Sequence, residues 1–261
     1  MLARASVVAA IVIAAYLYTR SLVERAAFAF GGLRRASATC GPALALSTLY
    51  HMMLSGNSWT DDPQATRQEA LSLARRAVRN AGDDAGTLGR AAYVLAYLGE
   101  DIDAATALID RAVHINPSFA DGLRWSGWLR LWAGLPDVAI DHFETSSRLN
   151  PRVRLGTTLM EKGVALFFAR HLEQARTMLL LALQHHPDWI PTNRFLAACY
   201  AHLGQLDEAK IIIERLRALT PVVLPSADNW RDSKQREFYL SGLRLAMSEA
   251  ASPASAVVVA D

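Results

Sequence analysis

Apolar residues recur at every third or fourth position along most of this chain, which is the spacing of one face of an α-helix. The segments 69–78 (EALSLARRAV) and 209–219 (AKIIIERLRAL) show the pattern most clearly. Glycine and proline are sparse and clustered, and the long alternating β-branched runs that would predict strands are missing. The pattern therefore predicts an all-α protein.

Four segments share a further pattern, in which an alanine is followed by a bulky apolar residue after four positions and by a proline after twelve. The alanines are Ala105, Ala139, Ala175 and Ala209, the bulky residues are Ile109, Phe143, Leu179 and Ile213, and the prolines are Pro117, Pro151, Pro187 and Pro221. The small residue lets a neighbouring helix approach, the bulky one fills the gap, and proline ends the helix. The prolines lie 34, 36 and 34 residues apart, and such a period predicts a solenoid of helical hairpins.

With these positions the chain resembles the tetratricopeptide repeat (TPR) family. In that family the first helix of a repeat carries a small residue seven positions before the turn glycine, and the matching residues here are Ala92, Gly127, Gly163 and Ala197. The resemblance implies a right-handed α-solenoid over 21–221, with repeats at 85–117, 118–151, 152–187 and 188–221. The segment 62–84 would be the second helix of a fifth repeat, and 22–36 leaves a degenerate sixth open. The third repeat departs from the pattern, because Arg170 replaces the turn glycine.

A narrower resemblance covers roughly residues 20–248. The segments 59–78, 101–117 and 239–246 are similar to TPR arrays that lie C-terminal to bacterial adenylate or guanylate cyclase domains and winged-helix transcriptional regulators. This resemblance implies an alternative function, namely a regulatory or sensor fragment of such a protein that lacks its effector domain.

The first twenty residues form an apolar segment of their own. Residues 5–19 carry no charge, but they fall short of the roughly 20 apolar residues that cross a bilayer. A helix packed on the first repeat, a membrane anchor and an export signal all remain open. An anchor would leave the repeats in the cytoplasm, because arginines follow it. The two widely spaced cysteines favour a reducing setting, so the predicted localisation is cytoplasmic, with an inner-membrane-anchored form as the alternative.

The C-terminal part, 222–250, is predicted to be a loop and a capping helix. A solenoid exposes the apolar face of its last hairpin, and the amphipathic segment 232–250 would cover that face. The cover is expected from Phe238, Leu240, Leu243 and Leu245. Residues 251–261 are predicted to form a disordered tail.

Composition and motifs argue against catalysis. A net charge of +2 on 261 residues gives no support for whole-molecule attraction to nucleic acid. Cys40 and Cys199 are expected to be small buried residues. The neighbours His185 and His186 point to different sides of a helix, and no HExxH, GxSxG or glycine-rich phosphate loop occurs. We expect no catalytic residues, no metal and no cofactor.

The TPR resemblance implies a concave surface lined by the first helix of each repeat. The aromatic and basic residues at its positions are Tyr93, Tyr97, Arg124, Trp128, Trp132, Phe168 and Arg194, with Arg90 one place out of register. Two interpretations stay open: the aromatic residues pack between hairpins, or they contact a ligand, since Trp, Tyr and Arg are frequent interface anchors. The predicted function is a non-catalytic scaffold that binds an extended peptide or a partner helix. Arg124 and Arg194 would hold an acidic group of that partner, such as a C-terminal carboxylate.

Overall fold

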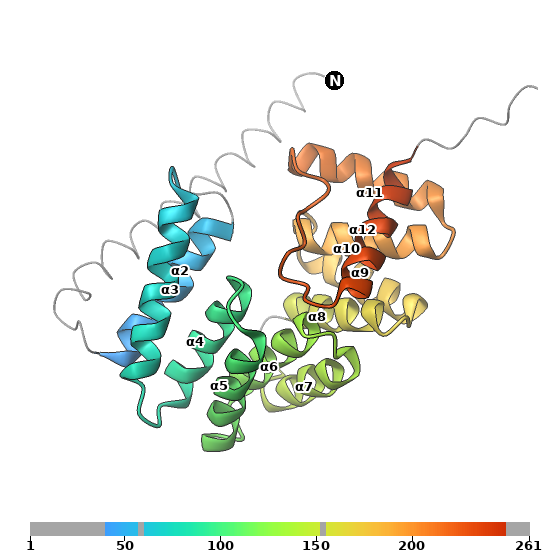
Figure 1. The fold of residues 1–261 in the computed structure, drawn as a ribbon. Coiled ribbons are helices and arrows are strands. Elements are labelled where there is room, and N and C mark those ends of the chain that lie inside the picture. The colour runs from blue at the N-terminus through green and yellow to red at the C-terminus, as the bar shows by residue number, and fades with distance from the viewer. Residues whose placement is uncertain (1–39, 57–59, 152–154, 249–261) are drawn as a thin grey trace, which may run out of the picture. The chain divides into compact units, whose positions relative to one another are not determined.

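The computed structural model describes residues 40–56, 60–151 and 155–248, and in these ranges it contains helices and loops but no strand. Figure 1 labels the helices: α2 (Gly41–Gly56), α3 (Pro63–Arg79), α4 (Ala85–Tyr97), α5 (Ile102–Ile115), α6 (Ala120–Trp132), α7 (Pro136–Leu149), α8 (Leu155–Phe168), α9 (Leu172–His185), α10 (Ile190–His202), α11 (Leu206–Leu219) and α12 (Ser233–Met247). The all-α prediction is confirmed. The predictions for the apolar segment 5–19, for a degenerate repeat at 22–36 and for the tail 251–261 concern residues outside these ranges.

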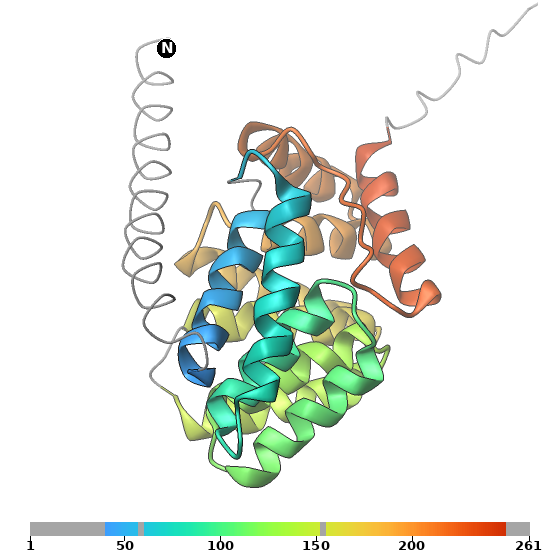
Figure 2. The ribbon, with the colours of Figure 1, turned by 60° about the vertical axis from the view of Figure 1, so that its left-hand side comes forward.

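The chain divides into two compact units, Met1–Leu129 and Arg130–Asp261, and the boundary falls within α6. In the first unit α2 packs on α3 and α4, and α4 packs on α3 and α5; Figures 1 and 2 both show α2 and α3 side by side. In the second unit α8 packs on α7 and α9, and α10 packs on α9, α11 and α12. Consecutive antiparallel pairs thus build each unit, as the repeat period predicts.

Burial follows the repeat pattern closely. Each of the four alanines and each of the four bulky residues that follow them is at most 2% exposed. Ala92, Gly127, Gly163 and Ala197 are buried as well. At Gly163 a Cβ atom would stand 2.8 Å from Cγ of Leu179, so α8 and α9 approach too closely for any larger residue. These observations confirm the predicted packing of the hairpins.

The turns inside the hairpins share one backbone conformation. Gly99, Gly134 and Gly204 have φ angles of 93°, 89° and 76°. Each turn closes with a hydrogen bond from the residue after the glycine to a carbonyl five positions back, for example from Leu135 to Arg130 at 2.8 Å. Arg170 adopts the same conformation with φ 67°, although a side chain in this region costs roughly 1–2 kcal/mol. The third hairpin therefore keeps the turn geometry of the others despite lacking the glycine.

Aspartates start several of the helices. The side chains of Asp62, Asp84, Asp101 and Asp232 accept hydrogen bonds from backbone N–H groups in the first turns of α3, α4, α5 and α12. Such caps satisfy donors that have no partner within the helix. The start predicted at Asp61 or Asp62 followed by Pro63 is confirmed with Asp62 as the cap.

Two expectations about single residues are wrong. Leu245 is 46% exposed, because the buried face of α12 consists of Gln235, Tyr239, Gly242, Leu243 and Ala246. Cys40, the residue before α2, is exposed. Cys199 is buried as expected, and its Sγ atom donates to the carbonyl oxygen of Leu172 at 3.1 Å. Burial raises the pKa of this thiol to about 12, so the group is protonated at neutral pH.

Candidate peptide-binding surfaces

In the first unit a tryptophan of α6 gathers the basic and aromatic residues. The guanidinium carbons of Arg90 and Arg124 lie 5.6 and 5.9 Å from the centroid of the Trp125 ring. Tyr93 stacks on the same indole with 6.1 Å between ring centroids. These four residues are called the Trp125 cluster below. Cation–π contacts of this kind stabilise by about 0.5–2 kcal/mol, so the cluster is held together by more than hydrophobic burial.

A glycine makes the Trp125 cluster possible. A Cβ atom at Gly89 would stand 3.1 Å from Cε3 of Trp125, so the missing side chain lets the indole lie against α4. The sequence pattern did not predict Trp125, because the repeat register pointed to Trp128. Arg90 lies one position away from the place that the repeat register assigns. The same one-position offset from Arg124 would have pointed to Trp125.

The other predicted residues of the first unit are placed differently. Tyr97 packs against the hydrophobic core around α3 and α4, and burial raises the pKa of its hydroxyl. Trp128 is half-buried on α6. Arg124 has a side chain that is 20% exposed, with Nε 3.4 Å from Oδ1 of Asp121. The guanidinium of Arg124 is thus paired with a carboxylate of its own helix.

In the second unit the predicted residues contact the chain's own C-terminal segment, 221–247, called the C-terminal segment below. Arg194 on α10 donates from Nε to the carbonyl oxygen of Val223 at 3.1 Å and from a terminal nitrogen to that of Val222. The backbone N–H of Arg231 donates to the carbonyl oxygen of Trp132 at 2.8 Å. Hydrogen bonds to main-chain groups therefore fix both ends of the stretch 222–231.

Aromatic side chains of the C-terminal segment face aromatic side chains of α8 and α10. The ring centroids of Trp230 and Phe168 lie 4.4 Å apart, and Tyr239 stacks on Phe195 at 4.3 Å with an interplanar angle of 18°. Trp230 and Tyr239 are 4% and 3% exposed. Rings that bury this much surface are the usual anchors of protein interfaces.

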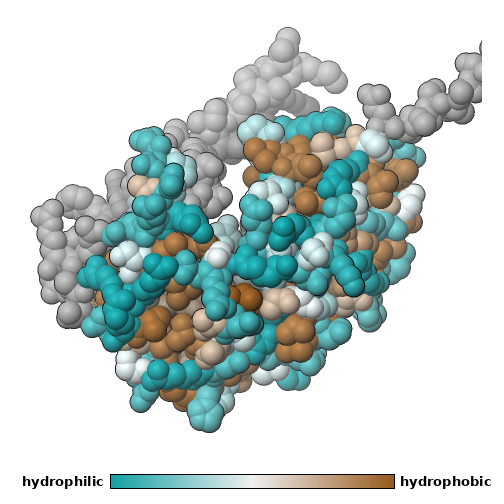
Figure 3. Space-filling view, viewed as in Figure 1, coloured by the Kyte–Doolittle hydropathy of each residue, from teal (hydrophilic) through white to brown (hydrophobic). Residues whose placement is uncertain are grey.

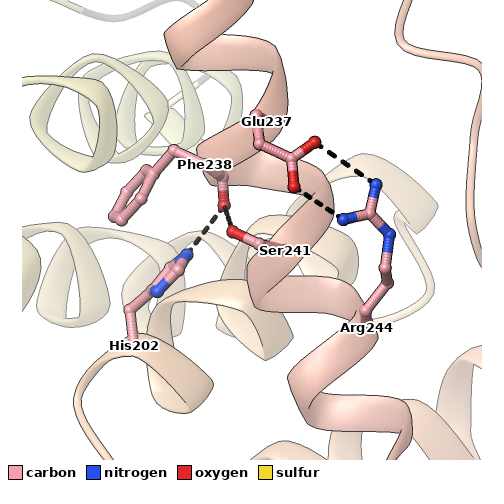
Figure 4. Close-up of polar contacts among 5 residues, drawn as sticks. All are labelled: His202, Glu237, Phe238, Ser241 and Arg244. Carbon is pink, nitrogen blue, oxygen red and sulfur yellow. Dashed lines mark hydrogen bonds and ion pairs between the residues drawn. The ribbon is translucent and has the colours of Figure 1, made fainter.

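His202 at the end of α10 contacts the third aromatic residue of the C-terminal segment. Figure 4 shows its Nε2 atom donating to the carbonyl oxygen of Phe238 at 2.7 Å, and the same oxygen accepts from Ser241 at 3.0 Å. The His202 and Phe238 rings stack at 3.8 Å, and the guanidinium carbon of Arg170 lies 3.1 Å from the Phe238 centroid. Burial is the main cause that lowers the pKa of His202, and the positive charge of Arg170 lowers it further.

Solved structures show which fold these hairpins form. The chain matches PilW, described as a widely conserved type IV pilus biogenesis factor, at 18% identity over 78% of this chain and 89% of that one, with a TM-score of 0.55. It also matches TTC0263, a thermophilic TPR protein of Thermus thermophilus, at 20% identity over 76% and 99% of the two chains, with a TM-score of 0.53. The chain has the TPR fold. No protein-family model and no curated protein matches it, and the narrower resemblance to cyclase-linked arrays stays a prediction.

Other features of this TPR array lie away from the predicted residues. An open hollow of about 520 Å³ at the α8–α9 turn is lined by Arg170, His171, Leu172, Glu173, Gln174 and Leu203. Across the described ranges, no group of three His, Cys, Asp or Glu side chains could hold a metal ion. None of the helices in those ranges combines the length and hydropathy of a bilayer crossing. On the face shown in Figure 3, polar and apolar side chains interleave.

Proposed function

We propose that this chain is a non-catalytic scaffold whose first helices bind an extended peptide or a partner's helix. The observation that carries the proposal is the contact between Arg194 and the carbonyl oxygens of Val222 and Val223. A surface predicted to bind a peptide holds a polypeptide by its main chain, here one from the same molecule. The two unpaired, widely spaced cysteines favour a reducing cytoplasm as the place where the scaffold works.

The Trp125 cluster supports a site for an acidic ligand in the first unit. Arg124 forms an ion pair with Asp121, whose own side chain is 58% exposed and can move aside. A carboxylate of a partner would replace it and accept two parallel hydrogen bonds from the guanidinium. The half-buried indole of Trp128 lies one helical turn further along α6 and would contact an apolar side chain of the same ligand. The proposed partner is therefore a segment with an acidic group, such as a C-terminal carboxylate, beside a hydrophobic residue.

The test is a selection followed by a titration. Random peptides displayed on phage are selected against the full chain, and the enriched peptide is titrated by calorimetry into the parent, Arg124→Ala and Trp128→Ala. Loss of the guanidinium should weaken binding by about 1.5–3 kcal/mol, the range for hydrogen bonds to charged groups.

The matched control is Arg79→Ala, because Arg79 is an exposed arginine at the end of α3. It should bind the peptide like the parent. If Arg124→Ala and Trp128→Ala are folded and also bind like the parent, the acidic-ligand site is not at the Trp125 cluster.

A further inference from the structure

We propose that the C-terminal segment is a releasable internal ligand of the second unit. It occupies the surface of α8 and α10, and an external peptide with the same chemistry binds there by displacing it. That chemistry is an extended stretch with two free main-chain carbonyls, followed by aromatic side chains. The inference rests on the proposed function, since it requires that first-helix surfaces bind peptides.

The path of the C-terminal segment exceeds what a cap requires. A capping helix needs to cover the last hairpin, which is α10 and α11. α12 packs chiefly on α10 and less on α11, and the stretch before it runs back to the α6–α7 turn. There Asp232 lies close to Gly134: a Cβ atom added to Gly134 would stand 3.0 Å from the Cβ of Asp232. The segment therefore follows the first helices of the unit, as a bound peptide would.

The contacts are of the kind that recognise a ligand. The Arg194 guanidinium donates hydrogen bonds to two successive carbonyl oxygens. Any extended peptide offers such a pair. Trp230, Phe238 and Tyr239 each face an aromatic partner, which is Phe168, His202 and Phe195 respectively. Hydrogen bonds to the main chain give a peptide affinity, and pockets for its side chains give specificity.

Two strained backbone positions belong to the C-terminal segment or contact it. Among the described residues other than glycine, Arg170 and Ala227 have positive φ angles, 67° and 59°. Arg170 places its guanidinium on Phe238, and Ala227 accepts the hydrogen bond that turns the chain toward Trp230. Strained non-glycine residues cluster at ligand clamps and switch regions. Arg170 thus joins a strained backbone to a contact with the C-terminal segment, and Ala227 is a strained residue of the segment itself.

The packing of α12 also leaves room for release. Oε1 of Gln235 is buried and accepts no hydrogen bond from the described part of the chain, and a buried acceptor of this kind destabilises the packed state. The ion pair between Glu237 and Arg244 lies on the exposed side of α12 (Figure 4), where such pairs contribute little. Water would satisfy Gln235 once the helix moved away, which lowers the free energy of opening.

Hydrogen exchange on the unmodified full chain is the first test. After correction for intrinsic rates, the slowest amides of α12 should exchange at least tenfold faster than the slowest amides of α8–α11. This result would show that the segment opens while the rest of the second unit stays folded. Equal rates would show that α12 opens when the whole unit unfolds, and would overturn the proposal.

Binding in trans is the second test. A fluorescent peptide covering 221–248 is titrated against the full-length parent and against full-length Tyr239→Ala, which weakens the resident segment but leaves the surface intact. Tyr239→Ala should bind the peptide at least tenfold tighter than the parent, and adding Arg194→Ala should reverse the gain. Leu245→Ala, at the 46% exposed position on α12, should behave like the parent.

A folded Tyr239→Ala variant that shows no gain would mean that the segment is a permanent cap. If Tyr239→Ala does not fold, hydrogen exchange on the parent decides alone. Neither measurement uses the Trp125 cluster or an external partner. A negative result for the C-terminal segment therefore leaves the titration of Arg124→Ala unaffected. A negative result in that titration likewise leaves the tests of the C-terminal segment unaffected.

Discussion

The side chain of Phe238 lies between a histidine and an arginine. His202 stacks on its ring and donates to its carbonyl oxygen, and the guanidinium of Arg170 lies over the ring as well. A neutral imidazole fits this arrangement, since a second positive charge next to Arg170 would be repelled. Burial and the charge of Arg170 both lower the pKa of His202, and the hydrogen bond to the Phe238 carbonyl opposes them in part.

This balance predicts that acid destabilises the contact. Because the pKa of His202 is lower in the folded than in the unfolded state, protonation favours the unfolded state. The stabilising effect of the neutral His202 side chain is complete above its pKa in the unfolded state, about 6.5, and declines as the pH falls below that value. Melting temperatures measured from pH 7.5 to 5.0 should therefore fall less for His202→Gln than for the parent. The exposed His171→Gln should follow the parent curve, and equal slopes for all three proteins would contradict this account.

At the scale of the helix pair, close approach is set by small residues on the second helix. Ala139 on α7 has no exposed surface, whereas its neighbour Val138 is 38% exposed. The two residues differ by one position in sequence and by the side of the helix on which they lie. We therefore expect a larger side chain to be tolerated at position 138 and not at position 139.

A matched pair of leucine substitutions tests this register. Ala139→Leu should lower the free energy of unfolding by roughly 1–3 kcal/mol, because overpacking forces the helices apart. Val138→Leu should change it by less than about 0.5 kcal/mol, as is usual for surface sites. Urea denaturation measures both values. Similar losses for the two variants would show that the assigned register of the hairpins is wrong.

At the scale of the whole molecule, the sequence predicts the array well and the C-terminal segment poorly. In repeat proteins each hairpin contacts chiefly its neighbours in the chain, so a local period such as Ala105 to Ala139 is enough to predict the hairpins. The path of the C-terminal segment depends on contacts between distant residues, such as Arg194 with Val222, which no period encodes. The amphipathic pattern of 232–250 predicted a helix, but not that Leu245 would face solvent. The Trp125 cluster was missed for a smaller reason, a shift of one position at Arg90.

If the first helices of this array bind peptides, the NMR signals of their tryptophans should respond to a bound peptide. The chain has six tryptophans, and each gives one indole N–H signal in a ¹H–¹⁵N spectrum. Once assigned by single substitutions, the signals of Trp125 and Trp128 should shift when the selected acidic peptide is added. Trp189, at the start of α10 against His186, should not respond. Saturating binding that leaves Trp125 and Trp128 unshifted would contradict the account.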